Sequence, residues 1–135
     1  MLKKIKEWIR PQGLEGASTP LDRKATFVVT YGKKLIGTLT LDHGNWSFRY
    51  SDDYKDERFI APLFDFPDVD KVYTSDSLWP FFEGRIPGLK QPSIQDAIEK
   101  EKIDQTDLVA LLARFGKRTI ANPFVVEQKN GFALT

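Results

Sequence analysis

The spacing of apolar residues predicts a sheet in the first half of the chain and helices in the second. Residues 25–31, 35–41 and 46–50 alternate apolar with polar positions and are rich in β-branched and aromatic side chains, with turn-forming residues at 32–34 and 42–45. This pattern predicts three antiparallel strands in a meander, with one aromatic face and one polar face. On the second strand we expect Leu35, Gly37, Leu39 and Leu41 to share a face.

The rest of the chain supplies helices and a final pair of strands. Residues 51–58 predict a charged surface loop, and 61–67 a short edge strand that Pro62 and Pro67 keep from the sheet centre. One helix is expected to begin at Ser93 and another, capped by Thr106, to end at Gly116. Residues 124–128 and 131–135 flank an Asn-Gly turn and predict a C-terminal hairpin. The fold class is therefore α+β: an antiparallel, meander or barrel-like sheet with two to three helices.

The N-terminal 20 residues differ from the rest of the chain. Residues 2–10 place apolar side chains at helical spacing among lysines and an arginine, which predicts a short basic amphipathic helix that ends at Pro11. The Gly- and Ser-rich stretch that follows is typical of a linker, so we expect the domain to span residues 21–135. Such a helix could lie on its own domain, on a partner or on a membrane surface.

Composition narrows the possible functions. Twenty basic side chains face nineteen acidic ones, which argues against nucleic acid as a direct partner because phosphate binding usually requires a basic excess. The chain contains no cysteine and one histidine, so it has no thiolate metal site or cysteine nucleophile. It also lacks an apolar run of the roughly 20 residues that span a bilayer. We expect a cytoplasmic protein without metal, cofactor or membrane partner.

The residues offer little catalytic chemistry. His43 is the only imidazole and falls in a predicted turn, where a solvated role is expected. Acidic residues cluster at 52–57 and 65–76, but the second group lacks the central glycine and terminal glutamate of a calcium loop. No glycine-rich phosphate loop of either common type occurs. The sequence therefore predicts a protein that is not an enzyme by itself; an enzyme that uses Asp65, Asp68 and Asp70 is the alternative.

The segment 74–88 has an unusual composition, since aromatic residues alternate with proline and glycine. Phe81 and Phe82 are expected in the core. Trp79 follows the polar run Ser75–Ser77 and precedes Pro80, which could open a short helix. Tryptophans in such positions often dominate binding energy, so Trp79 is a candidate for contact with a partner.

Four segments in succession, GTLTLDHGNWSFRY (37–50), FIAPLFDFP (59–67), LWPFFEGRIPG (78–88) and DLVALLARFG (107–116), resemble the N-terminal domain of the HipA family over roughly residues 25–127. Two segments depart from the family pattern: 83–88 replaces an NLLPEG-like run, and 117–123 replaces a Cys-x-Gly-Ala-like one. The 135 residues contain no kinase core, so the chain resembles HipS, the stand-alone component of tripartite HipBST toxin–antitoxin systems.

The resemblance implies an antitoxin that binds and inhibits a HipA- or HipT-like Ser/Thr kinase toxin, with a helix-turn-helix HipB-like DNA-binding protein as a possible third component. An activating or structural subunit of a split kinase, or a nucleic-acid-binding accessory that uses the N-terminal lysines with Lys117 and Arg118, is the alternative. The candidate partner-binding residues are Ser75, Asp76, Ser77, Leu78, Trp79 and Arg85.

Overall fold

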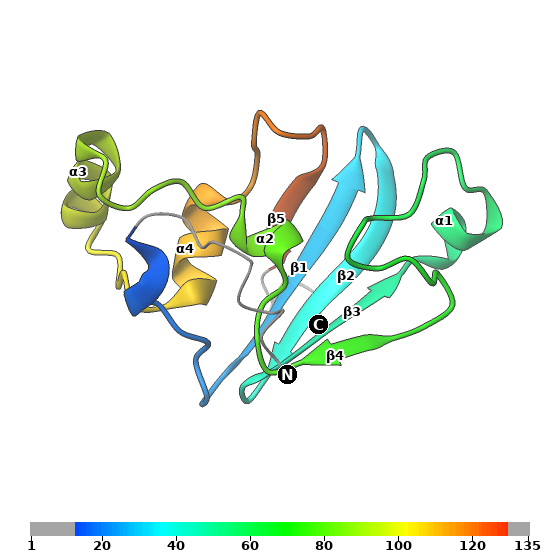
Figure 1. Ribbon diagram of the computed structural model, residues 1–135, viewed down its shortest axis with the longest axis horizontal. Coiled ribbons are helices and arrows are strands. Elements are labelled where there is room, and N and C mark those ends of the chain that lie inside the picture. The colour runs from blue at the N-terminus through cyan, green and yellow to red at the C-terminus, as the bar shows by residue number, and fades with distance from the viewer. Residues whose placement is uncertain (1–12, 130–135) are drawn as a thin grey trace, which may run out of the picture.

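Five antiparallel strands form one open sheet in the order β4-β3-β2-β1-β5 in the computed structural model, which describes residues 13–129 (Figure 1). The strands are β1 (Lys24–Tyr31), β2 (Lys34–Asp42), β3 (Asn45–Tyr50), β4 (Tyr73–Ser75) and β5 (Val125–Lys129). Together with the helices they confirm the α+β class. The predicted helix at 2–10 and the second strand of the C-terminal hairpin, 131–135, lie outside the described residues.

The meander of β1, β2 and β3 is confirmed, and its aromatic face is the floor of the core. Trp46, Phe48 and Tyr50 alternate along β3 and are all buried. The prediction for the start of β2 was wrong, because the register between β1 and β2 shifts at a bulge after Val29. The extra residue turns Ile36 into the core and leaves Leu35 exposed, whereas Leu39 and Leu41 point inward as expected.

Four α-helices and a 3-10 helix, η2 (Leu14–Gly16), accompany the sheet in residues 13–129. The helices are α1 (Asp52–Asp56), α2 (Pro80–Glu83), α3 (Pro92–Glu101) and α4 (Leu108–Phe115). Figure 1 shows α2 over a face of the sheet, α1 at one side, and α3 and α4 at the other. Phe82 of α2 packs against Phe48 and Phe66, so α2 covers the aromatic face of the meander.

Capping side chains explain two differences from the predictions, an unexpected helix at α1 and a different cap residue at α4. The expected loop 51–58 contains α1, because the Ser51 side chain accepts a hydrogen bond from the Tyr54 amide and the Tyr54 ring is buried. At α4 the cap is Asp107 and not Thr106: its carboxylate accepts from the amides of Val109 and Ala110. The end of α4 at Gly116 is as predicted.

The expected linker is, from residue 13 on, part of the fold. Leu14 and Ala17 are buried in the core. Ser18 exchanges backbone hydrogen bonds with Thr106 and Leu108, and the Trp46 indole donates to the Thr19 hydroxyl. Composition alone missed this because the glycines and serines surround a single leucine that has a buried position to fill.

The edge strand predicted at 61–67 does not form, and β4 takes its place at the sheet edge beside β3. Residues 61–67 turn inward instead, with Leu63 and Phe66 buried. The Tyr50 hydroxyl holds this segment, since it donates to the Phe66 carbonyl (2.6 Å) and accepts from the Leu63 amide (2.9 Å). Burial raises the pKa of Tyr50.

Candidate partner-binding surface

The segment 74–79 runs from the end of β4 to the start of α2. The Ser75 hydroxyl accepts from the Ser77 amide (2.9 Å), and the Ser77 hydroxyl donates to the Asp76 carboxylate (3.3 Å), so the polar run forms a local turn. Asp76 and Ser77 are exposed and Ser75 is half-buried. Leu78, by contrast, is a core residue, which removes it from the surface proposed from the sequence.

Trp79 lies at the boundary between the core and the surface. It is the N-cap residue of α2, and Pro80 takes the first helical position as predicted. The indole is half-buried and packs edge-on against Phe66, with ring centroids 5.0 Å apart. Because that contact fixes one side of the ring, the accessible remainder could contact a partner with little loss of side-chain entropy.

An acidic residue from the preceding loop holds the start of α2. The Asp65 carboxylate accepts a hydrogen bond from the Phe81 amide at 2.8 Å, a favourable position for an anion at a helix N-terminus. Asp68 likewise accepts from the Asp70 amide within its own loop. In residues 13–129 no three His, Cys, Asp or Glu side chains come together as a metal site. These contacts support a structural role for the second acidic cluster.

Arg85 is buried and does not face a partner, contrary to the sequence hypothesis. Its guanidinium donates to the carbonyls of Gly116 (2.6 Å), Lys117 (2.8 Å) and Phe124 (2.5 Å), and to the Asn122 side chain (3.1 Å). All four of these acceptors are neutral, and burial lowers the pKa of Arg85 to about 10. The side chain therefore holds together both ends of the loop 117–124. No local motif signals this, because the acceptors come from residues more than 30 positions away.

His43 is the solvated turn residue that the sequence predicts. It sits between β2 and β3 with a left-handed backbone (φ 46°), and its Nδ1 lies 2.6 Å from the Asp42 carboxylate. The hydrogen bond from His43 lowers the pKa of Asp42. Both side chains are more than 60% exposed, whereas catalytic groups usually lie in sites that exclude water, so this exposure favours a solvated turn over a catalytic pair.

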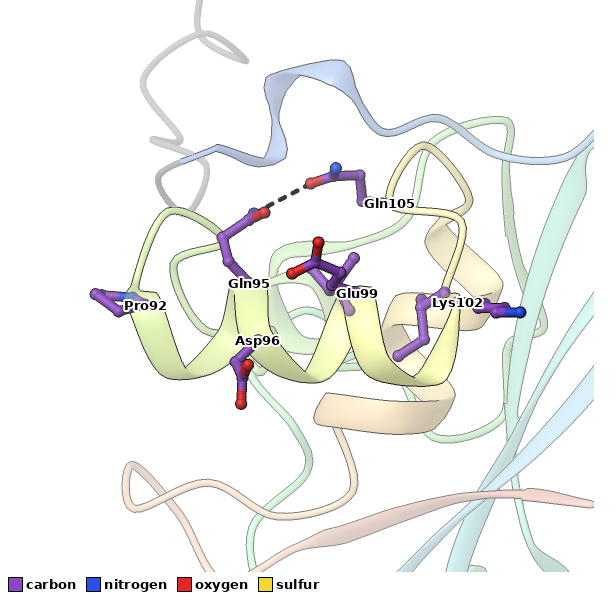
Figure 2. A pocket seen from close by; sticks show the side chains of 8 residues that line it. Pro92, Gln95, Asp96, Glu99, Lys102 and Gln105 are labelled. Carbon is purple, nitrogen blue, oxygen red and sulfur yellow. Dashed lines mark hydrogen bonds between the residues drawn. The ribbon is translucent and has the colours of Figure 1, made fainter.

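A shallow hollow lies along α3 and the loop after it (Figure 2). Its lining is mostly polar, and Gln95 crosses its upper rim to donate to the Gln105 side chain at 3.2 Å. None of the six partner-binding candidates lines it. Small-molecule sites are mostly enclosed and apolar, so this surface has little of their character.

Residues 27–121, from β1 into the loop 117–124, match the family model of the HipA N-terminal domain. The chain belongs to the HipA N-terminal domain family. This domain family places the chain in a HipA-related toxin–antitoxin context. No curated protein matches the sequence. The match includes the segment 74–79, Arg85 and most of the loop that Arg85 holds.

None of the helices in residues 13–129 is long and apolar enough to cross a membrane.

Proposed function

We propose that this protein is a non-enzymatic antitoxin, a HipS-like component that binds a HipA- or HipT-like Ser/Thr kinase toxin and inhibits it. The observation that carries the proposal is the family match over residues 27–121. A domain that is related to part of a kinase is expected to retain a surface complementary to a kinase. As a separate protein it must offset an association cost on the order of 4–15 kcal/mol, which requires a well-packed interface.

The surface around α2 supports binding as the mode of action. Trp79 combines a packed side with an accessible side, and the rigid start of α2 fixes its position. Pre-ordered aromatic residues of this kind supply large contact area at low entropic cost. Segment 74–79, with Trp79 as its anchor at the start of α2, is therefore the candidate contact with the kinase active-site region.

Co-expression with a HipA- or HipT-like kinase toxin from the same organism tests the proposal. Cells that express the kinase alone are expected to stop growing, and co-expression of this chain is expected to restore growth. The tagged chain should also capture the kinase, and a HipB-like DNA-binding protein if a third component is present. A catalytically dead kinase variant is the control, because it should be captured without affecting growth.

The alternatives predict other outcomes of the same experiment. An activating or structural subunit of a split kinase would be captured, but co-expression would increase toxicity. A nucleic-acid-binding accessory would bind DNA by itself with a steep dependence on salt. Failure to capture the kinase would contradict the antitoxin proposal.

A further inference from the structure

Four partly exposed aromatic rings form a continuous row at one end of the sheet. Phe59 contacts Tyr31 (5.7 Å between ring centroids), Tyr31 contacts Phe124 (5.5 Å), and Phe124 contacts Phe81 (5.8 Å), each edge to face. The four rings come from β1, the segment after α1, the segment before β5, and α2. Elements distant in sequence thus contribute to one apolar surface.

The loop 117–124 extends beyond this row. In Figure 1 it rises at the upper end of the sheet beside the turn between β1 and β2. Ile120 is fully exposed, although isoleucine is among the residues most often buried. The loop is nevertheless well held: Thr119 and Asn122 form a β-bridge, and the Asn122 side chain accepts from the Phe124 amide. Arg85 joins both ends of the loop from below.

A rigid loop that presents an aliphatic side chain to water is suited to a preformed contact. Single exposed apolar residues are common and need no explanation by themselves. Here, however, the buried Arg85 donates its hydrogen bonds to carbonyls at both ends of the loop, and Phe124 connects the loop to the aromatic row. Pre-ordering of this kind reduces the entropy lost on association.

Charge around the row indicates what kind of surface it fits. The segments 31–34, 57–59 and 117–124, which carry three of the four rings and the loop, contain five cations and one anion. They are Lys33, Lys34, Arg58, Lys117 and Arg118, against Glu57. Lys34 lies 5.5 Å from the Phe59 ring, and Lys117 pairs with Glu127. This excess contrasts with the near-neutral whole chain and favours a partner surface with an acidic rim.

We propose that Ile120, with the row Phe59, Tyr31, Phe124 and Phe81, is a docking surface for the partner kinase and fits an apolar depression with an acidic rim. The proposal rests on the proposed function. It adds a contact region that is separate from segment 74–79. Arg85 is the positioning residue of this surface, and Arg118 contributes to its charge.

Binding of the complete chain to the purified kinase, measured by titration calorimetry, tests this surface. Ile120→Asp is expected to weaken binding at least tenfold, because it places a charge in the apolar contact without affecting the fold. Leu21→Asp is the matched control: Leu21 is 74% exposed and lies against the turn between β2 and β3, at the opposite end of the sheet. The control should bind as the unaltered chain does. Arg118→Glu should weaken binding and reduce its dependence on salt.

The possible failures are distinguishable. If the unaltered chain does not bind the kinase, the proposed function and this surface both fail. If it binds and Ile120→Asp binds equally well, the surface is wrong and the proposed function stands. Equal losses in Ile120→Asp and Leu21→Asp would also overturn the surface, as would a self-association that Ile120→Asp abolishes without changing kinase binding.

Discussion

Segment 74–79 and loop 117–124 each place an apolar side chain at the surface, and we propose that both contact the partner kinase. Segment 74–79 carries Trp79, whose ring packs against Phe66. Loop 117–124 carries Ile120, which is fully exposed, and Arg85 donates hydrogen bonds to the two ends of this loop. Segment 74–79 begins at the end of the sheet opposite the turn at Tyr31, near which the second loop lies. Both regions depend on α2, since Trp79 caps it and Arg85 follows it.

The comparison of the two regions indicates that aromatic content and accessibility are separate properties. The aromatic, proline and glycine residues around Trp79 single it out in the sequence. Its exposure is nevertheless limited by the Phe66 ring, 13 residues away in sequence. Ile120 belongs to no motif, and its exposure follows from a loop shape that a distant arginine maintains. Variants must therefore distinguish the loss of a side chain that contacts the partner from the loss of a residue, such as Arg85, that holds the contacting segment in place.

The largest expected effect is that of Arg85→Met on stability. The substitution removes the Arg85 donor from the carbonyls of Gly116, Lys117 and Phe124, of which Lys117 keeps the Val126 amide as a second donor, and this loss should cost about 3 kcal/mol. Thermal and denaturant unfolding would measure it. Faster hydrogen exchange is expected in 117–124 and not in 74–79; equal protection of both regions would contradict the role assigned to Arg85.

The next effect concerns Trp79. Trp79→Ala is expected to weaken inhibition of the kinase by about 2 kcal/mol, or roughly 30-fold, as for other aromatic residues central to an interface. Trp79→Phe keeps an aromatic ring against Phe66, so its inhibition of the kinase should lie between that of the unaltered chain and that of Trp79→Ala. Phosphorylation assays at several concentrations of each variant would measure this, with melting temperatures as a check on folding. Unchanged inhibition by Trp79→Ala would remove segment 74–79 from the interface.

Tyr50→Phe is expected to have a smaller effect, confined to the Trp79 side of the molecule. The Tyr50 hydroxyl supports the segment that carries Phe66, so its loss should cost about 1.5 kcal/mol. A tyrosine ionises near pH 10 when unfolded, and burial raises the pKa of Tyr50 in the folded chain. Its contribution to stability is thus complete below about pH 10 and is lost as the pH rises further.

Unfolding curves from pH 8 to 11 would test that linkage. Stability should fall above pH 10 in the unaltered chain and fall less steeply in Tyr50→Phe. Tyr54, whose pKa burial also raises, should retain part of the dependence. The prediction fails if both proteins lose stability in parallel.

The local patterns of the chain predicted much of the fold. Alternation located β1, β2 and β3, and helical spacing with Gly116 located α4. Where prediction failed, long-range contacts decided the outcome: Tyr50 draws residues 61–67 inward, and a bulge opposite β1 exchanges the directions of Leu35 and Ile36. Such contacts leave no periodic trace in the segments they reshape.

The candidate surface was less predictable than the fold. The place of Trp79 before Pro80 indicated a helix start, which the structure contains. The sequence hypothesis places Leu78 and Arg85 on this surface because Leu78 lies within segment 74–79 and Arg85 follows it closely, yet both are buried. A charged residue among glycines and prolines is usually solvated, and the carbonyls of Gly116, Lys117 and Phe124, which converge on the guanidinium, offset the cost of burying Arg85.

Inhibition of the kinase by this chain can be measured by titrating the purified chain against a fixed amount of the kinase, with phosphate transfer to the kinase's protein substrate as the readout. If the chain is an inhibitor, phosphorylation falls steadily and is largely abolished near one equivalent of the chain. Phosphorylation that stays constant or rises as the chain is added would contradict it.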